Sequence, residues 1–372
     1  MSVTYQDYIN TLNSSIAQRI LKIEILDNNE NIIDELSSNV IEGDIQLSDE
    51  TGSRRNANVT FENTSGLYIP DPDGNIWMNR KFRIWTGLKV NSEDYYISRG
   101  IFVCSEPEIS SNLSENIVSI QMLDKFALLN NELGGSLENT YIIPVNSSIV
   151  DVVKQILLDA GEVKPPIIEP TSELTPYTIT KEAGSTYGDL LIELANMLSW
   201  TCYFDRDGYF RFEPPASLDT TGSSWDFTTS EIFYLNSKHR YEFSKVFNNV
   251  VVIGDNINGS TVRAVSSDTN INSPTRISKI GKKTLVINDN LIYNNDLAQQ
   301  RADAELQKSI SLVETTNISS IPIDFLEGGQ IITITDTSSD LNGDRFLIKN
   351  ISFPLITQGD MSMQAWKGRL LT

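Results

Sequence analysis

The N-terminal part of the chain alternates short apolar runs with polar turn clusters. Residues 20–26 are largely apolar, residues 27–30 read Asp-Asn-Asn-Glu, and residues 31–36 return as a second apolar run. Two apolar runs around a polar turn predict a β-hairpin. Similar runs follow at 40–47, 57–62, 81–86, 95–104 and 118–123, with turn signals at 71–75 and 134–135. Six or more short strands predict a small barrel or sandwich.

The hydrophobic period changes to that of a helix after Pro144. Apolar residues from Ile149 to Ala160 recur at the spacing of one helix face. Ser148 is placed to cap this helix, and Gly161 is placed to end it. The pattern therefore predicts an amphipathic helix at this position.

The same helical spacing recurs from Tyr187 to Leu198, with Ser185 or Thr186 as the first residue of the cap. Alternating apolar residues follow at 200–204, and Asp205-Arg206-Asp207-Gly208 predicts a turn into a partner strand at 209–213. Residues 138–218 are therefore expected to form an α+β module.

A second β-rich region begins near residue 219. Residues 241–246 and 249–254 have strand patterns, whereas 255–291 are polar without a clear period. Residues 295–309 predict a helix with one apolar stripe, formed by Ala298, Ala302 and Leu306. The strands near Val250 and Ile332 are expected to belong together, which makes the second β domain discontinuous.

The C-terminal end repeats a pattern used near the N-terminal end. The runs at 81–86, 100–104, 106–109 and 118–122 are matched in order by runs at 330–335, 344–348, 351–354 and 361–365. Matching order and matching loops favour an internal duplication. The alternative is that ordinary meander patterning recurs by chance.

These patterns predict a mainly β fold, α+β overall, with two homologous small antiparallel β-barrels. The predicted segments are a helix or arm at 1–18, a first barrel at 19–137, and the α+β module at 138–218. The second barrel is assigned to 219–256 and 311–372, interrupted by an inserted segment with one helix at 257–310.

Composition and charge argue against a membrane-spanning protein, a tight nucleic-acid binder and a secreted protein. The 372 residues are 40% hydrophobic and 21% charged, and no apolar run approaches the length of a membrane span. The formal net charge of −20 disfavours tight binding to nucleic acid or anionic lipid. The charge serves solubility or, alternatively, forms an acidic wall along which DNA slides. The start, Met1 to Asp7, lacks the pattern of a secretory signal, so export by the general pathway is not expected.

The residue types needed for catalysis are sparse. His239 is the only histidine, so histidine-based zinc sites and histidine pairs are excluded. Its neighbours Lys238 and Arg240 indicate an exposed or strand-edge position, and without a nucleophile-elbow sequence a structural role is favoured. Cys104 and Cys202 lie on separate strand-like segments, so a disulfide framework or thiolate metal site is not expected. Both cysteines are predicted to be small buried hydrophobes.

The carboxylate pairs and glycine pairs are explained by ordinary strand and turn positions rather than by catalytic or ligand-binding sites. Glu106 with Glu108, or Asp205 with Asp207, are the local candidates for glycoside hydrolysis, but such pairs are common on solvated strands and turns. The turns at 205–208 and 340–344 echo calcium loops but carry glycine at the wrong position. The pairs at 134–135 and 328–329 lack the strand-to-helix context of a phosphate site. We therefore predict no catalytic, cofactor or metal residues, and the sequence does not identify interface residues.

The order of these segments resembles a known family of viral structural proteins. Residues 55–61, 77–88, 96–103 and Glu106-Pro107 look like the N-terminal barrel of phage tail and baseplate hub proteins. The helix at 145–160, the segment from Tyr187 to Phe212 and the strand entry at Gly328-Gly329-Gln330 resemble the same family in the same order. The resemblance covers nearly the whole chain but includes no single diagnostic motif.

The resemblance implies a structural role without catalysis or cofactors. In that family two homologous β-barrels per subunit assemble as a homotrimer into a pseudo-sixfold ring, which joins the hexameric tail tube to a threefold spike or fibre. The implied partners are tail tube or distal tail subunits, the central spike or fibre protein, the tape measure protein and other baseplate components. DNA would pass transiently through the lumen. The implied location is the tail tip or baseplate of the virion, assembled in the host cytoplasm, in a phage or related contractile injection system. The family's occasional appended lysozyme or peptidase segment is not expected here, since the sequence stops at Thr372.

Two other classes remain as alternatives. A carbohydrate-binding or glycan-hydrolysing tail-tip protein would stack Trp77, Trp85 or Trp225 on sugar rings, although aromatic residues on strands more often lie in a core. A β-sandwich adhesin is disfavoured by the missing export signal.

Overall fold

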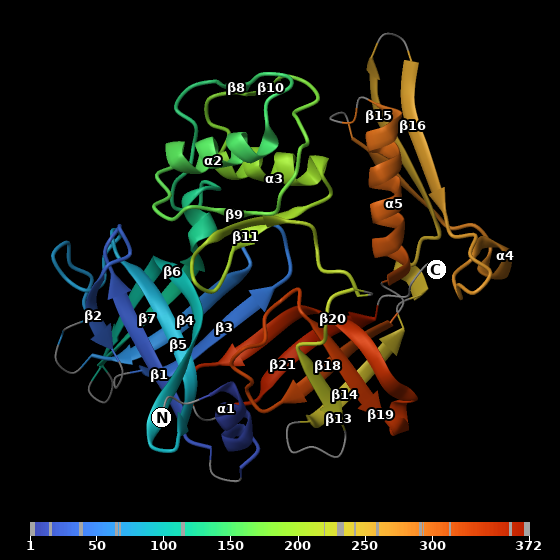
Figure 1. Cartoon of the computed structure of the whole chain (residues 1–372). Helices are drawn as coiled ribbons and strands as arrows, with labels where there is room; N and C mark the ends of the chain where they lie inside the picture. Colours follow the sequence, from blue (N-terminus) through green and yellow to red (C-terminus); the bar gives the residue numbers. More distant parts are fainter. Residues whose placement is uncertain are drawn as a thin grey trace. The chain divides into compact units, whose positions relative to one another are not determined.

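The computed structural model describes most of the chain (Figure 1). The described residues are 4–14, 17–36, 40–63, 66, 68–112, 116–218, 220–228, 234–241, 243–257, 260–289, 292, 294–311, 314–356 and 359–367. The chain divides into two compact units. The first contains 1–214, 321–327 and 351–361, and the second contains 215–320, 328–350 and 362–372. The chain therefore crosses from one unit to the other five times.

The first unit is built on a predominantly antiparallel sheet whose strands match the predicted runs. Along the sheet the order is β3-β4-β7-β6-β5-β1-β2. Inward residues alternate with outward ones, as on β4, where Ala57, Val59 and Phe61 are buried. The strands are β1 (Arg19–Leu26), β2 (Ile32–Leu36), β3 (Val40–Ser48), β4 (Arg55–Glu62), β5 (Lys81–Val90), β6 (Glu93–Ser111) and β7 (Asn116–Asp124). The mainly β prediction is therefore confirmed.

The Arg19 side chain connects the β1 end of this sheet to the segment beside β3 at its other end. Residues 351–355 run beside β3, where the Leu355 N–H donates to the Gly43 carbonyl at 2.9 Å. The Arg19 guanidinium on β1 donates to the carbonyl oxygens of Pro354 and Ile356 at 3.3 and 3.4 Å. It also lies 5.0 Å from the centre of the Phe353 ring. Among the described strands no backbone ladder closes this sheet, so Arg19 provides the closing contact where a barrel was predicted.

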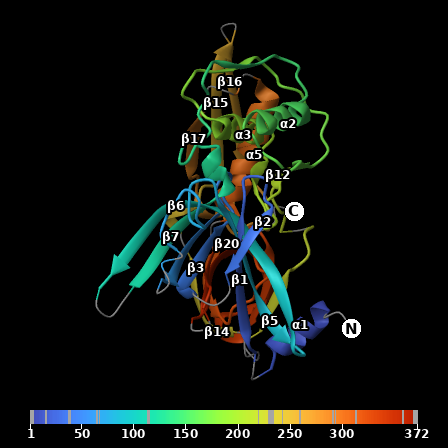
Figure 2. The same ribbon diagram turned by 90° about the vertical axis from the view of Figure 1, so that its left-hand side faces the viewer.

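A short N-terminal helix, α1 (Tyr5–Leu12), packs on β5 (Figure 2). Thr4 caps it by accepting the Asp7 N–H, while the Asp7 carboxylate accepts the Thr4 N–H in return. Tyr8 and Leu12 form its buried face. Figure 2 also shows β6 and β7 extending together beyond β5, because β5 pairs with β6 only as far as Val103.

The α+β module of the first unit follows the predicted order. Both helices begin at capping side chains, Ser148 for α2 and Thr186 for α3, and Thr186 forms a capping box with Asp189. Figure 1 shows α2 and α3 side by side over the small sheet of β9, β11 and β12. The elements are the 3₁₀ helix η1 (Lys125–Leu128), β8 (Tyr141–Ile143), α2 (Ile149–Asp159), β9 (Ile167–Ile168), β10 (Ile179–Lys181), α3 (Tyr187–Met197), β11 (Thr201–Phe204) and β12 (Phe210–Glu213).

The second unit contains a further part of the same 13-stranded sheet, to which β20 belongs by pairing with β3. The order in this part is β14-β18-β21-β20-β19-β13, in which β13 pairs with β19 in parallel and β19 pairs with β20 in antiparallel fashion. A hairpin joins β19 and β20, as predicted, but its turn is formed by the short 3₁₀ helix η3 (Thr337–Ser339) and Asp340, and residues 341–344 lie in β20. The strands are β13 (Trp225–Thr228), β14 (Tyr234–Tyr241), β18 (Glu314–Ser320), β19 (Ile331–Asp336), β20 (Leu341–Pro354) and β21 (Met361–Lys367).

The two parts of the sheet share one strand order. In the first unit the path β3-β4-β7-β6-β5-β1 connects strands in the same permutation as β14-β18-β21-β20-β19-β13 in the second. The matched runs of the sequence are the meanders β5-β6-β7 and β19-β20-β21. One pair differs, because β1 is antiparallel to β5 whereas β13 is parallel to β19. The repeated order supports duplication over chance recurrence of a meander.

An inserted module lies in the chain between β14 and β18, where the first part of the sheet has only a short turn. Here the structure corrects three predictions. The strand near Val250, β15 (Asn249–Ile257), pairs with β16 (Ser260–Ser267) and β17 (Thr284–Asn288), not with the strand at Ile332. The polar stretch 255–291 therefore holds two strands. Of the predicted strand at 241–246, residues 243–245 form the 3₁₀ helix η2 (Phe243–Lys245).

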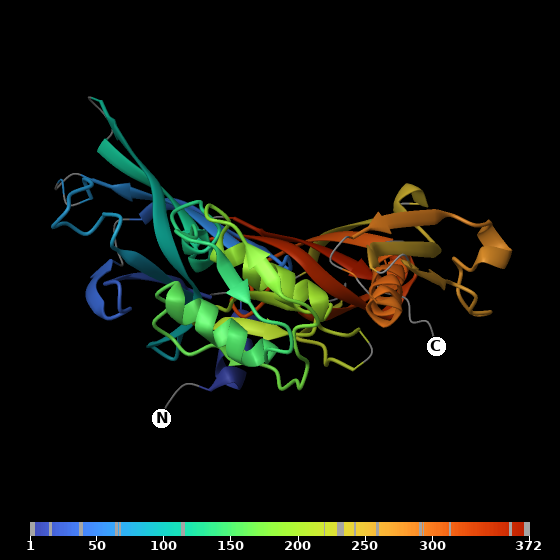
Figure 3. The ribbon, with the colours of Figure 1, turned by 90° about the horizontal axis from the view of Figure 1, so that it is seen from above.

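A helix explains why β15 is apolar. The predicted helix is present as α5 (Asn295–Ser311), orange and seen end-on in Figure 3, and it packs on β15 and β16. Its stripe of Ala298, Ala302 and Leu306 contacts a core that includes Val250 and Val252. The inner face of β15 is thus covered by a helix, which the apolar pattern alone does not distinguish from a second sheet.

Candidate functional site

The carboxylate pairs considered from the sequence occupy ordinary structural positions. Glu106 and Glu108 are exposed on β6. Asp205 accepts the backbone N–H groups of Asp207 and Tyr209 at 3.0 Å each, and its other oxygen lies 2.7 Å from Arg211 Nε. Asp205 therefore shapes the β11–β12 turn, as the hairpin interpretation predicts.

The other singled-out side chains are dispersed. His239 on β14 lies 3.8 Å from a Glu314 oxygen, with its ring edge-on to Phe346. Trp77 and Trp85 are half-buried in the first unit, and Trp225 is half-buried in the second. Cys202 is buried and Cys104 half-buried, both as free thiols. Burial raises the pKa of Cys202 to about 12 and that of Cys104 to about 11, so neither is a ready nucleophile at neutral pH.

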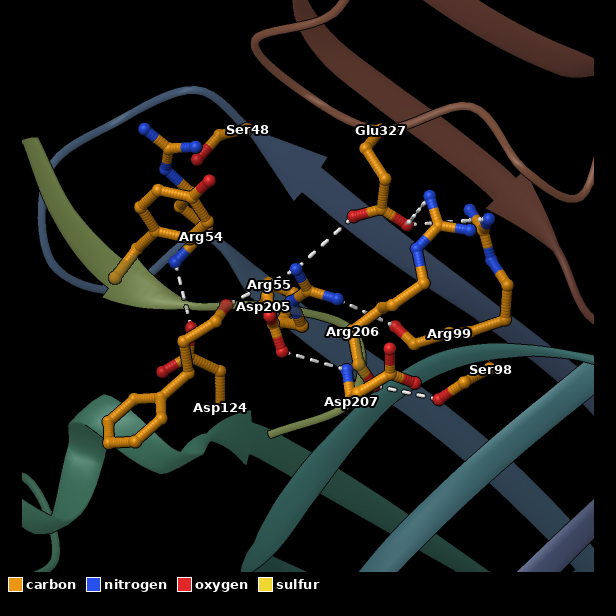
Figure 4. A network of polar contacts seen from close by, with 12 residues as sticks. Ser48, Arg54, Arg55, Ser98, Arg99, Asp124, Asp205, Arg206, Asp207 and Glu327 are labelled. Carbon is orange, nitrogen blue, oxygen red and sulfur yellow. Dashed lines mark hydrogen bonds and ion pairs between the residues drawn. The ribbon is translucent and has the colours of Figure 1, made fainter. Parts of the chain in front are cut away.

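One polar constellation is a cluster of three arginines around Glu327, all in the first unit. Figure 4 shows Arg55, Arg99 and Arg206 converging on this carboxylate. Their guanidinium nitrogens lie 3.2, 3.5 and 3.4 Å from its oxygens. Burial raises the pKa of Glu327, but the charges of Arg55, Arg206 and Arg99 outweigh it and hold the pKa below its usual range. One carboxylate thus unites β4, β6, the β11–β12 turn and the segment 321–327.

Arg99 is the centre of this cluster and is fully buried. Its guanidinium donates to the carbonyl oxygens of Asp324 and Leu326 and lies 4.3 Å from the centre of the Phe353 ring. Burial lowers the pKa of Arg99 to about 10, which leaves the group charged at neutral pH. A buried guanidinium requires such partners because an unpaired charge is costly to bury. Arg99 therefore fixes two returning segments, 321–327 and the one containing Phe353.

A neighbouring contact ties the loop before β4 to the end of β7. The Asp124 carboxylate accepts the backbone N–H of Arg54 at 2.9 Å and that of Phe126 at 2.6 Å. Burial raises the pKa of Asp124 to about 6 against these hydrogen bonds, which lower it. The Arg54 guanidinium stacks on Tyr203 at 3.5 Å and donates to Thr201 Oγ1 at 2.8 Å. Arg54 therefore attaches the sheet to β11 of the α+β module.

A second ionic cluster joins the same two parts from another direction. Glu30 lies 3.3 Å from Lys81, 2.6 Å from Lys125 and 2.8 Å from Lys164, and Lys125 also lies 2.7 Å from Glu162. Burial raises the pKa of Glu30, but Lys125, with help from Lys164 and Lys81, outweighs it and lowers the pKa to about 2. The hairpin turn between β1 and β2 is thereby held to η1 and to the loop after α2.

A third contact fastens α1. The Tyr8 hydroxyl donates to Asp324 Oδ2 at 2.6 Å, and Arg19 Nη2 lies 3.6 Å from Asp324 Oδ1. Both Tyr8 and Asp324 are fully buried, and burial with the nearby carboxylate raises the pKa of Tyr8 well above its usual value. The helix is thus attached to the segment 321–327.

These clusters share one property: their buried carboxylates are engaged by cations, N–H groups or a hydroxyl. Such arrangements hold segments in register and position them. In the described part of the chain, no group of three or more His, Cys, Asp or Glu side chains is placed to hold a metal ion. No described helix is long and apolar enough to cross a membrane.

Sequence patterns did not reveal the arginine cluster. Its members come from four segments separated by up to 272 positions, and charged residues carry no periodic pattern that relates such segments. One local signal was present: Arg99 interrupts the apolar run of β6, between Ile97 and Ile101. A charged residue inside a buried strand predicts a buried partner.

Comparisons by sequence find no relatives: no protein-family model matches, and no curated protein matches the chain.

Comparisons by structure find tail proteins. A tail protein from Neisseria meningitidis is similar over 93% of this chain and 96% of its own, with a TM-score of 0.68 and 11% identity. The 43 kDa tail protein of prophage MuSo2 from Shewanella oneidensis is similar over 93% and 98%, with a TM-score of 0.64 and 16% identity. An E. coli component of the type VI secretion system, itself similar to T4 tail proteins gp27 and gp5, is similar over 89% and 74%, with a TM-score of 0.55 and 11% identity. The chain has the fold of these phage tail and type VI secretion proteins.

Proposed function

We propose that this chain is a structural hub subunit at the tip of a phage tail or related contractile injection machine. Three copies would form a ring in which six similar sheets face the hexameric tail tube, while the threefold symmetry matches a spike or fibre. The role is non-enzymatic and needs no cofactor. It places the protein in the virion, after assembly in the host cytoplasm.

The observation that carries this proposal is the repeated strand order. A trimer can meet a sixfold partner only if each subunit supplies two equivalent elements, and β3-β4-β7-β6-β5-β1 and β14-β18-β21-β20-β19-β13 are such elements. The similarity to tail proteins over almost the full length of both chains supports the same role. It is the whole chain, not one module, that shares their fold.

The proposed partners follow from this position. They are tail tube or distal tail subunits above the ring, the central spike or fibre below it, the tape measure protein, and other baseplate components around the α+β module. DNA would pass through the lumen transiently. The formal net charge of −20 favours passage over binding.

The first experiment is the mass of the purified chain by light scattering over a range of concentrations, followed by negative-stain imaging. The expected result is a species of three times 41.6 kDa that appears as a ring with six similar lobes. A chain that stays monomeric at every concentration, or a trimer that forms no ring, would contradict the hub. A monomer that binds specific sugars on a glycan array would favour the carbohydrate-binding alternative.

A further inference from the structure

Charge is distributed unequally between the two units. The second unit contains equal numbers of acidic and basic residues, so the whole formal net charge of −20 belongs to the first unit. Within the second unit, the segment between β16 and β17 begins with the buried Asp268, and its residues 269–283 include Arg276, Lys279, Lys282 and Lys283 and no acidic residue. We call residues 269–283, which include the short helix α4 (Ile277–Ile280), the basic loop.

The basic loop is held in a fixed shape by buried polar groups. The Asn248 side-chain amide donates to the carbonyl oxygens of Thr275 and Gly281, at 2.8 Å each, and its oxygen accepts the Lys283 N–H at 2.8 Å. The buried Asp268 carboxylate accepts hydrogen bonds from the hydroxyl groups of Ser273 and Thr275, at 2.5 and 2.6 Å. The loop is therefore anchored at its base and its middle.

This fixed loop exposes apolar and cationic side chains together. Ile271 is 78% exposed and Ile280 is 44% exposed. Lys279 and Lys282 are exposed, and neither forms an ion pair with any residue that the structure describes. A rigid surface that presents isoleucines to water is typical of an interface, because little ordering entropy is lost when a partner covers it.

The first unit contains a surface of opposite charge and similar character. Beyond Val103, β6 pairs only with β7, and this two-stranded extension exposes Glu106 and Glu108. Ile109, which alternation places on the other face of β6, is 47% exposed. Neither glutamate forms an ion pair within the described residues. We call residues 104–112 and 116–121 the acidic arm.

We propose that the basic loop of one copy docks on the acidic arm of a second copy, pairing Lys279 and Lys282 with Glu106 and Glu108. Such a contact is heterologous, because two different surfaces meet, and heterologous contacts that repeat around an axis close into rings. The proposal rests on the proposed trimer and names the residues that join its subunits. Nucleic acid is a weaker occupant, because residues 269–283 include no aromatic side chain on which a base could stack.

Charge reversal tests this pairing. We expect the double variants Lys279→Glu/Lys282→Glu and Glu106→Lys/Glu108→Lys each to raise the trimer dissociation constant by about tenfold to a hundredfold. The variant that carries all four changes restores opposite charges and should return to within about threefold of the wild type. The matched control is Lys154→Glu/Lys308→Glu, which reverses two exposed lysines on α2 and α5 and should leave the trimer unchanged.

The outcomes separate this contact from the proposed function. A monomeric wild type contradicts the trimer itself. A trimeric wild type whose two charge-reversed variants are also trimeric, or whose quadruple variant is not restored, contradicts this pairing alone. If the wild type shifts a DNA duplex in a gel, and Lys279→Glu/Lys282→Glu abolishes that shift without changing the trimer, the loop is a nucleic-acid contact instead. Circular dichroism and urea unfolding of each variant exclude loss of folding as the cause.

Discussion

The variant Glu327→Gln should lower the urea concentration at which the first unit unfolds. The amide keeps the shape of the carboxylate, so packing changes little, but the negative charge facing three guanidinium groups at 3.2 to 3.5 Å is lost. Arg99 retains its carbonyl acceptors yet stays buried and charged. Removing one partner of a buried ionic cluster costs about 3–5 kcal/mol, a large part of the roughly 5–15 kcal/mol that stabilises a domain.

The assay is urea unfolding followed by tryptophan fluorescence. Trp77, Trp85 and Trp200 report on the first unit, and Trp225 and Trp366 report on the second. A loss of about 4 kcal/mol lowers the midpoint by roughly 2 M if the slope is about 2 kcal/mol per molar urea. The matched control is Glu106→Gln, an exposed glutamate whose replacement should change stability by less than about 0.5 kcal/mol.

The pH dependence gives a second check. The pKa of Glu327 is lowered in the folded chain, so its contribution is present above the ordinary glutamate value of 4.5 and is lost as pH falls through the folded value. The difference in unfolding free energy between wild type and Glu327→Gln should therefore become smaller as the pH is lowered. If the unfolding free energy of Glu327→Gln lies within about 1 kcal/mol of the wild-type value at pH 7, the reasoning is refuted. That result would show that the cost of burying the Glu327 charge cancels its attraction to the arginines.

Three further changes probe other contacts. Tyr8→Phe removes the hydroxyl that donates to buried Asp324 and should cost about 1–3 kcal/mol, measured by urea unfolding of the first unit; an unchanged midpoint would mean that α1 is not fastened there. Glu30→Gln should lower the free energy of unfolding at pH 7. Because the pKa of Glu30 in the folded chain is about 2, the difference in unfolding free energy between variant and wild type should disappear only as pH falls from 4.5 toward 2. Urea midpoints measured at several pH values test this. Leu306→Ala, which truncates a buried side chain on α5, should cost about 2–5 kcal/mol in the transition of the second unit; a shift in the first unit's transition instead would contradict the assignment of α5.

Local chemistry made much of the fold predictable. Ser148 and Gly161 delimit α2 because a hydroxyl satisfies the first free N–H groups and glycine accepts a positive φ, +81° here. The choice between Ser185 and Thr186 required the structure, which shows Thr186 accepting the Asp189 N–H at 3.0 Å. Caps and apolar periods depend on neighbours in sequence, so the sequence reveals them.

Strand partners and ionic clusters depend on residues that are distant in sequence. The apolar run at Val250 is compatible with a sheet on both faces, and only the structure shows that α5 covers one of them. The sequence did not predict β16, because only Val262 and the small Ala264 of this strand are in the core and their neighbours are mostly polar. This leaves no clear apolar alternation. Glu327 follows an ordinary loop sequence, and nothing near it indicates that Arg55, Arg99 and Arg206 will surround it.

The five crossings of the chain between the two units have a mechanical consequence. A conventional linker is one peptide strand, and a fragment cut there keeps each domain whole. Here a fragment ending at Pro214 lacks Asp324, Glu327 and Phe353, so the charges of Arg99 and its neighbours lose their partners. Tension applied to one unit is likewise divided among five covalent connections before it reaches the other. No single break of the chain therefore separates one complete unit from the other.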